Sequence, residues 1–557
     1  MAGIDLAIVA LFVIATFAAG LYFYRWVGDM DDFCVAGRRL TPFILAATLT
    51  ATNVNLYSFV GQAGKAYASG ASILWHTWTG NMAMVVAGLF IIPIYRRLRI
   101  RTIPEFLDSR YGVSARVIVG LLWFLRLSFW LGVVLYTAVV AATTMAGGSQ
   151  VQVLGVTVNS WHLWVIAFSA GAIIYTILGG MWSEALMDAV QFVFMMAGAL
   201  IVLPLVMREV GWWPGLVAKL PAEHMKLVTQ TGSFNWVFTI AILLLGIEWA
   251  ATDQGLLQRA FGARNTRTVA RGMVLAGIIT TPFALLWILP GLAAVVITPG
   301  IVKTDTAIPS MLASLLPAGV MGFVICGFLA SQVSTIDSNL SAAATLFTND
   351  VWATLRGKSA NSAEALRVVR WMTFVSGVFM VGFSYWVTTF EAAVNAYLTV
   401  ISIMDMPLFV AVVFGLLWRR ANIAGALVGY FAGAAAGALA NFGLGWGFNI
   451  ATFVSGGVAA AGCIVASLAY RPTEQSKVDG VWKAKHVSQE ELDAHDVYHI
   501  WPVSWGGKLS LGVLAVGMLV FLGGTVSGAW DWRYASLSAV VGMVVFFGGG
   551  LLRLAFD

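Results

Sequence analysis

The sequence predicts an all-α membrane protein with about fifteen transmembrane helices. The chain has 557 residues, of which 60% are hydrophobic and only 10% are charged, and its mean hydropathy is +0.86. A soluble protein would carry about 25% charged residues. Apolar runs of about 18 residues or more recur along the chain, and such a run can cross a bilayer as a helix. We therefore expect a multi-pass protein of the cell membrane.

Fifteen apolar segments follow one another along the chain. The first lacks the basic start and the small-residue cleavage site of a signal peptide, so we interpret it as a membrane helix. The ninth is longer than one bilayer crossing requires, so it must tilt or protrude. The predicted spans are about 6–24, 43–69, 72–95, 117–146, 160–178, 183–207, 234–258, 270–297, 313–347, 368–389, 394–418, 421–441, 448–470, 508–527 and 534–555.

Arginine and lysine are concentrated in alternate loops. They occur in the loops after spans 1, 3, 7, 9, 11 and 13, whereas the loops after spans 2, 4, 10 and 12 contain none. The longer loop after span 6, which contains Arg208, Lys219 and Lys226, is an exception. Because cytoplasmic loops are enriched in basic residues, we expect the N-terminus outside and the C-terminus inside. The net charge of +6 therefore reflects the basic residues of the cytoplasmic loops, and we expect no nucleic-acid partner.

Two predicted spans are interrupted by polar residues and glycine at mid-depth, at 51–55 in span 2 and at 246–255 in span 7. Each is the first helix of a block of five, and the two blocks have opposite orientations. Paired interruptions in inverted halves indicate a transport site at the membrane midplane. We divide the chain into four parts. A leading helix and loop (1–42) precede a first five-helix block (43–233) and a second, inverted block (234–420). Trailing helices follow (421–557), and they carry a cytoplasmic loop at 471–507.

A polar face in the ninth span suggests a cation site. Ser331, Ser334, Thr335 and Ser338 recur at helical spacing, and polar oxygen at this depth needs a partner or an ion. The hydroxyls of Ser334 and Thr335, the carbonyl of Ser331 and carbonyls freed in span 2 would suit sodium. Spacing alone leaves an alternative open, in which these hydroxyls join helices or bond back to the carbonyl four residues earlier.

Several short motifs, in order over about residues 30–420, resemble those of the sodium:solute symporter family. This family includes bacterial sugar, sialic acid and proline symporters and animal sodium–glucose cotransporters. The resemblance implies the inverted five-helix-repeat fold of the leucine-type transporters with extra flanking helices. It also implies a sodium site at Ala51, Val54, Ser331, Ser334 and Thr335. The motifs are AGRRL at 36–40, GKAY at 64–67, TIPEFLDSRY at 102–111, YTILGGM at 175–181, DAVQ at 188–191, QR at 258–259, ST at 334–335 and TND at 348–350.

A second cation site is suggested by Asp188, Asp337 and Ser338. In relatives of the sialic acid type, the matching positions hold an additional sodium, with serine where Asp337 stands here. An ionised carboxylate in a membrane needs a cation, a proton or a basic partner. Asp337 could therefore bind sodium, carry a proton that couples to transport, or pair with Arg126 or another base.

The solute site is predicted from residues at membrane depth. Arg126 in span 4 could clamp a solute carboxylate, but we favour a structural salt bridge with Asp188, Asp337, Glu248 or Asp253. Asp405, at a kink before Pro407, is interpreted as a cap or network partner. Long polar residues that contact sugar in the sodium–galactose type are absent here. Hydroxyls and aromatic rings remain, which suit the apolar face of a pyranose or polyol. The predicted solute contacts are Ser58, Thr77, Trp130, Trp249, Arg126 and Asn395.

The sequence thus predicts a secondary transporter that works by alternating access. Sodium would drive symport of a small organic solute, with a sugar or polyol favoured. The alternative is a sodium- or proton-coupled symporter of an organic anion or amino acid, whose carboxylate Arg126 would bind. A membrane sensor module is a remote alternative. We expect no enzyme activity, because no nucleophile–base pair or metal cluster occurs in the spans, and we expect the chain to function as a monomer.

Overall fold

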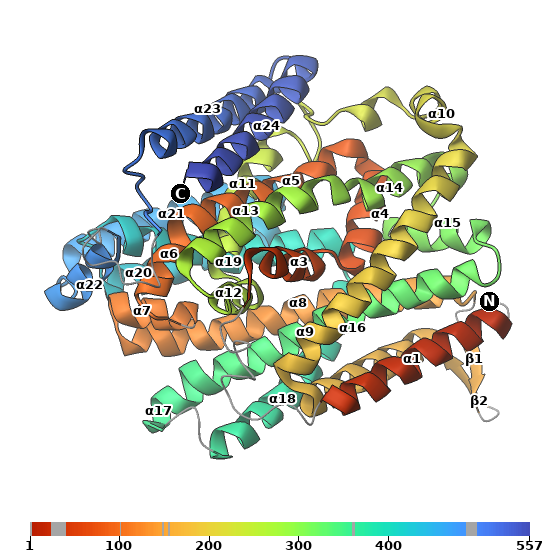
Figure 1. The fold of residues 1–557 in the computed structure, drawn as a ribbon, viewed down its shortest axis with the longest axis horizontal. Coiled ribbons are helices and arrows are strands. Elements are labelled where there is room, and N and C mark those ends of the chain that lie inside the picture. The colour runs from red at the N-terminus through yellow and green to blue at the C-terminus, as the bar shows by residue number, and fades with distance from the viewer. Residues whose placement is uncertain are drawn as a thin grey trace.

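The computed structural model describes residues 3–23, 40–100, 102–147, 150–153, 156–358, 363–485 and 498–556, and it is helical almost throughout (Figure 1). Among these residues, eleven helices are long and apolar enough to cross a membrane, or twelve if one bent pair counts as a span. This number is below the fifteen predicted. Three further apolar helices are shorter over their described lengths, at Gly3–Thr16, Pro42–Ala51 and Ser160–Ile174.

The first half begins with α1 (Gly3–Phe23) and α3 (Pro42–Asn53). Thr41 caps α3 by accepting a hydrogen bond from the Ile44 N–H, and proline at the first helical position favours this start. After a break, the chain continues through a π-helical turn into α4 and then reverses at Gly70 into the next span. These elements are η3 (Ser58–Gln62), α4 (Ala63–Ser69), η4 (Gly70–Ile73), α5 (Leu74–Val86), η5 (Ala87–Ile91) and α6 (Ile92–Arg97).

The first half ends with α7 (Ile103–Tyr111), α8 (Val113–Met145), a short antiparallel hairpin and the continuous helix α9 (Ser160–Val210). The hairpin pairs β1 (Gln150–Val153) with β2 (Val156–Asn159). We predicted two spans where α9 lies. Straight, its 51 residues would measure about 77 Å, more than twice a bilayer core of about 30 Å. Figure 1 shows the early and late parts of α9 running in different directions, so the chain turns without leaving helical structure.

The second half contains the second broken span, α11 (Trp236–Thr252) and α12 (Gln254–Phe261), which are bent by 49° at Asp253. Its long helix α16 (Val320–Leu346) carries the polar face and packs against α8 and α9. Short elements connect the two halves: α10 (Trp212–Lys219) and η6 (Ala222–Met225). The other elements are α13 (Thr266–Phe283), α14 (Leu285–Ile297), η7 (Thr304–Thr306), α15 (Ala307–Leu315), η8 (Phe347–Ala353), α17 (Thr354–Arg356), α18 (Ala363–Val387) and α19 (Ala393–Leu417).

The trailing helices form two antiparallel pairs. The pair α20 (Ile423–Ala438) and α21 (Gly447–Ala469) packs against α19, with η9 (Leu439–Gly443) between them. The pair α23 (Trp505–Ser527) and α24 (Trp532–Phe556) lies side by side, and α24 also contacts α5 and α13 (Figure 1). The predicted connector 471–507 contains a helix, α22 (Gln475–Lys485), while residues 486–497 lie outside the described part.

Candidate functional site

The break in α3 exposes backbone polar groups at its C-terminal end. Val54 has an extended conformation, with φ −97° and ψ 108°, and its N–H donates to the Thr50 carbonyl over 3.2 Å. The last carbonyls of a helix lack intrahelical donors, so a break inside a membrane supplies oxygen ligands. In the second broken span, Asp253 ends α11 and caps α12, since its Oδ1 accepts from the Leu256 N–H over 2.9 Å.

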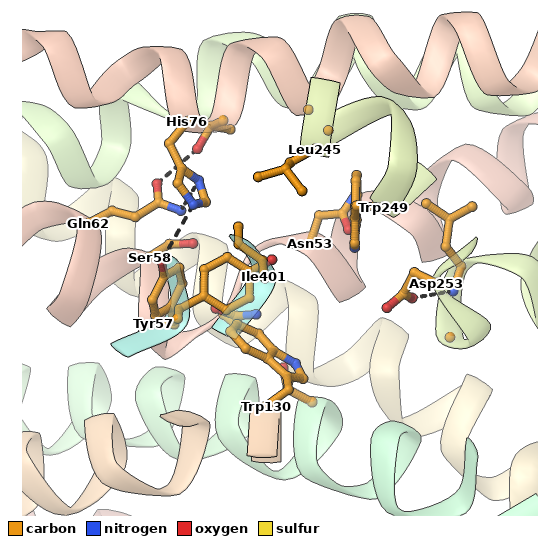
Figure 2. A pocket seen from close by; sticks show the side chains of 18 of the residues that line it. Asn53, Tyr57, Ser58, Gln62, His76, Trp130, Leu245, Trp249, Asp253 and Ile401 are labelled. Carbon is orange, nitrogen blue, oxygen red and sulfur yellow. Dashed lines mark hydrogen bonds between the residues drawn. The ribbon is translucent and has the colours of Figure 1, made fainter. Parts of the chain in front are cut away.

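A cavity of about 140 Å³ lies between the two broken spans and is bordered by α5, α8, α16 and α19 (Figure 2). Most of its polar lining is neutral, and four large aromatic rings face it. The polar residues are Asn53, Asn55, Ser58, Gln62, His76, Thr77, Asn81, Arg126, Asp253, Thr280, Thr335 and Asn339, and the aromatic residues are Tyr57, Trp130, Trp249 and Tyr397.

Five of the six predicted solute residues line this cavity: Ser58, Thr77, Trp130, Trp249 and Arg126. Asn395 does not. Its Nδ2 donates to Oε2 of Glu391 over 2.9 Å, near the start of α19. The helix therefore presents Tyr397 and Ile401 to the cavity, and it directs Asn395 elsewhere. This residue alone among the predicted solute contacts lies outside the cavity lining.

Arg126 forms a buried salt bridge with Asp405. Its Nη2 lies 2.7 Å from Oδ2 of Asp405, and its Nε lies 3.1 and 3.2 Å from the two carboxylate oxygens. The side chains are only 5% and 1% exposed. We expected a salt bridge, but to Asp188, Asp337, Glu248 or Asp253. The partner is instead Asp405 of α19, which lies across the cavity wall from α8, and this bidentate contact neutralises the guanidinium.

The predicted sodium ligands lie on two elements that border the same cavity. Ser331, Ser334 and Thr335 are buried on α16, while Ala51 and Val54 lie at the end of α3. Thr335 lines the cavity, as do Asn53 and Asn55 beside the break. Thr335 Oγ1 donates to the Ser331 carbonyl over 3.0 Å, which is the backbone bond considered as an alternative. That hydroxyl keeps its lone pairs and can still accept a cation. The sodium site stays a prediction.

The predicted second cation site contains a base that the sequence reasoning missed. Asp337 and Ser338 are buried on α16, with exposures of 3% and 4%. Arg259 of α12 donates from Nη2 to Ser338 Oγ over 3.1 Å and from Nη1 to the Gly255 carbonyl over 3.0 Å. Asp188 belongs to α9, but its side chain lies outside the described part of the structure. The second cation also stays a prediction.

Gln62, His76, Tyr57 and Tyr397 line the cavity but were not predicted to do so. Two local signals pointed to them: Gln62 follows Ser58 by one helical turn, and His76 precedes Thr77. The aromatic rings pack together, with centroid distances of 5.3 Å for Tyr57–Trp130 and 5.0 Å for Trp130–Tyr397. They give the cavity an aromatic wall beside its amides and hydroxyls.

Two broken helices in opposite halves, with a polar cavity between them, define a secondary transporter. A family model described as the sodium:solute symporter family matches residues 33–433. The chain belongs to this family, as its motifs suggested. It is a multi-pass protein of the plasma membrane that carries out sodium-coupled symport of a solute.

Relatives and solved structures agree with this assignment. The chain is 23% identical over 464 residues to the sodium/glucose cotransporter of Vibrio parahaemolyticus, covering 77% of this chain and 83% of that protein. It is 26% identical over 482 residues to sodium/glucose cotransporter 1 of Oryctolagus cuniculus, covering 77% and 70%. The structure of a Na⁺-coupled sialic acid symporter in a substrate-bound outward-open state superposes with a TM-score of 0.75. It is 20% identical and covers 85% of this chain and 99% of that one. This likeness shows the leucine-type transporter fold.

Proposed function

We propose that this protein couples the inward sodium gradient to uptake of a small organic solute by alternating access, and that the solute is a sugar or a related polyol. The observation that carries this proposal is the cavity between the broken spans. Its polar lining is dominated by neutral amides and hydroxyls, and its one arginine is already neutralised by Asp405. A neutral solute with many hydroxyls fits such a lining better than an anion does.

The aromatic wall supports the sugar or polyol. Trp130 and Tyr397 lie in contact, and Tyr57 lies 5.4 Å from Tyr397 between ring centroids. The C–H face of a pyranose packs on such rings, while its hydroxyls need amide and hydroxyl partners on the other side. Two of the relatives are named sodium/glucose cotransporters, which is consistent with a solute of this class.

Sodium is proposed to bind first, between the break of α3 and the polar face of α16. The carbonyls of Ala51, Val54 and Ser331 and the hydroxyls of Ser334 and Thr335 would surround it. Because these ligands come from two elements, the ion holds the elements together and orders the adjacent solute cavity. Separation of the two elements in the inward-open state would remove ligands and release the ion.

An organic anion is the second candidate solute. Arg126 lines the cavity, and its Nη1 takes no part in the salt bridge with Asp405, so it could donate to a carboxylate. Against this, adding a second carboxylate beside Asp405 would place two negative charges on one guanidinium. A proton-coupled variant of the same cycle would use Asp337 as the proton carrier.

Uptake into proteoliposomes tests the proposal. With a sodium gradient, radiolabelled monosaccharides and polyols should accumulate, and replacing sodium by choline should abolish accumulation. Thr335→Ala and Ser334→Ala should each raise the sodium concentration for half-maximal uptake by about tenfold or more, because each removes one of about five ligands. Thr335→Ser keeps the hydroxyl and is the matched control. Uptake that persists without sodium and follows pH instead would contradict sodium coupling.

A further inference from the structure

A chain of hydrogen bonds runs through the helices behind the cavity and ends inside it. The indole Nε1 of Trp287 donates to Gln62 Oε1 over 3.0 Å, and Thr77 Oγ1 donates to the same oxygen over 2.9 Å. Gln62 Nε2 lies 3.3 Å from His76 Nδ1, and His76 Nε2 lies 3.5 Å from the Tyr57 hydroxyl. Figure 2 shows Gln62, His76 and Tyr57 gathered at one end of the cavity.

The first donor fixes the direction of the whole chain. An indole N–H can only donate, so the Gln62 atom that faces Trp287 must be the amide oxygen. The amide nitrogen therefore faces His76 and donates to Nδ1. A neutral imidazole whose Nδ1 accepts carries its proton on Nε2, which then points at the Tyr57 oxygen. The proton of the Tyr57 hydroxyl is consequently directed away from His76, and Tyr57 lines the cavity.

A buried acceptor lies two residues before Tyr57. Asn55 is in the break of the second predicted span, is 5% exposed and lines the same cavity. Its Oδ1 is buried and has no hydrogen-bond partner among the described residues. A buried amide oxygen without a donor is unfavourable by about 1–3 kcal/mol, so a ligand that donates to it gains affinity.

We propose that Tyr57 and Asn55 form a donor–acceptor pair that selects solutes bearing alcohol hydroxyls. This inference rests on the proposed function, because it assumes that the solute occupies this cavity. The Tyr57 hydroxyl donates to a solute oxygen, and the Asn55 amide, whose oxygen is covered in this structure, turns so that the oxygen accepts from a solute hydroxyl. An alcohol satisfies both, whereas a carboxylate can accept from Tyr57 but has no proton for Asn55. Trp287, Gln62 and His76 are positioning residues, since they set the direction in which Tyr57 donates.

The first experiment identifies a solute and then removes the pair. Thermal shifts of the purified wild type are measured in sodium chloride with D-glucose, D-galactose, myo-inositol and N-acetylneuraminic acid. For the solute that binds, Tyr57→Phe should weaken binding about five- to tenfold, which corresponds to one lost hydrogen bond. Tyr430→Phe removes a buried hydroxyl outside the cavity and should leave affinity unchanged. Equal affinities for these two variants would overturn the proposal.

Deoxy analogues of the bound solute locate the contacted hydroxyl. In the wild type, removing the hydroxyl that pairs with both residues should weaken binding more than Tyr57→Phe does, because the deoxy analogue loses the bond from Tyr57 and the bond to Asn55. In Tyr57→Phe the same deoxy analogue should lose less affinity than it does in the wild type, because the bond from Tyr57 is already absent and only the bond to Asn55 can still be lost. If every deoxy analogue loses as much affinity in the variant as in the wild type, no solute hydroxyl pairs with Tyr57 and the proposal fails.

A third variant tests the direction of the chain of hydrogen bonds. Trp287→Phe keeps a large ring but removes the donor that fixes Gln62, and Trp287 itself is absent from the cavity lining. When Trp287→Phe is introduced into the wild type, it should weaken solute binding. When it is introduced into Tyr57→Phe, it should have no further effect on binding. An equal loss in both backgrounds would mean that Trp287 acts only through packing, and it would overturn the positioning role.

The outcomes separate the two proposals. If a neutral sugar or polyol binds and Tyr57→Phe does not change its affinity, the proposed function stands and the donor–acceptor pair is contradicted. Sodium-dependent binding of N-acetylneuraminic acid that does not change when its alcohol hydroxyls are removed would contradict both the donor–acceptor pair and the preference for a neutral solute. Binding of a neutral solute that depends on Tyr57 and on one hydroxyl supports both.

Discussion

At the scale of single residues, the buried ion pair of Arg126 and Asp405 links two helices at the cavity. Both side chains are almost fully buried, so each charge relies on the other for compensation. Losing one partner of such a pair destabilises a protein by about 3–5 kcal/mol, whereas replacing both by neutral groups is often tolerated. The pair therefore fixes α8 against α19 at the wall of the cavity.

Single and double neutral variants test this contact. Arg126→Gln and Asp405→Asn should each lower the melting temperature strongly, because each leaves a buried charge unpaired. The double variant should recover much of this loss, as measured by nanoscale scanning fluorimetry in detergent. Lys358→Gln, which breaks an exposed pair with Glu364, serves as the control and should change stability by less than about 1 kcal/mol. A double variant as unstable as the sum of the singles would show that the charges are not coupled.

At the scale of helices, the broken helices and the glycine-rich helix pair have different roles. The breaks at Val54–Asn55 and Asp253 supply polar groups to the cavity, and they were recognisable in the sequence because asparagine, aspartate and glycine interrupt apolar runs. The trailing pair α20 and α21 instead packs tightly. Glycines recur every four residues on one face of α20, which lets the two backbones approach closely. They are Gly425, Gly429, Gly433 and Gly437.

A bulky residue on this face should separate the two helices. A Cβ at Gly429 would lie 2.6 Å from the Ala459 carbonyl oxygen, so Gly429→Leu cannot be accommodated without movement of the backbone. We expect a lower melting temperature, with the sodium dependence of the remaining uptake unchanged, because α20 and α21 lie outside the predicted cation site. Gly457→Leu on α21 faces open space and is the matched control. Equal stability of the two variants would contradict a glycine-mediated contact.

At the scale of the whole molecule, the basic residues predict which loops are cytoplasmic. The connection between α14 and α15 belongs to the outer side in this prediction, and the segment after α21 belongs to the inner side. Val302 and Gln475 are exposed positions in these two regions. The prediction is independent of the fold, because an inverted orientation would have the same helices and the same contacts.

Cysteine labelling checks this orientation. In a variant whose native cysteines at 34, 326 and 463 are replaced by serine, Val302→Cys should react with a membrane-impermeant maleimide on intact cells. Gln475→Cys should react only after permeabilisation. Retained sodium-dependent uptake shows that the labelled protein is folded. The opposite pattern would place the C-terminus outside and overturn the topology.

The number of membrane helices shows where sequence reasoning is less reliable. Apolar length identified the helical regions, but the predicted connection at 179–182 is helical in the structure, within α9. Hydropathy measures how apolar a segment is. It does not show whether two apolar segments are separated by a loop or by a bend within one helix. Boundaries between adjacent spans therefore depend on the packing of their neighbours.

The sequence by itself determined the membrane class, the two broken helices and the polar face of α16. The reason is that a bilayer offers no water to backbone or side-chain polar groups, so each exception to an apolar run is informative where it stands. Tertiary structure decided which of these exceptions meet. Arg126 pairs with Asp405, which lies 279 positions away in the sequence. Gln62 accepts a hydrogen bond from Trp287, which lies 225 positions away. Such pairings depend on how helices pack and rotate, which spacing along one helix does not specify. The composition of the cavity, and the direction in which Tyr57 donates within it, follow from that packing.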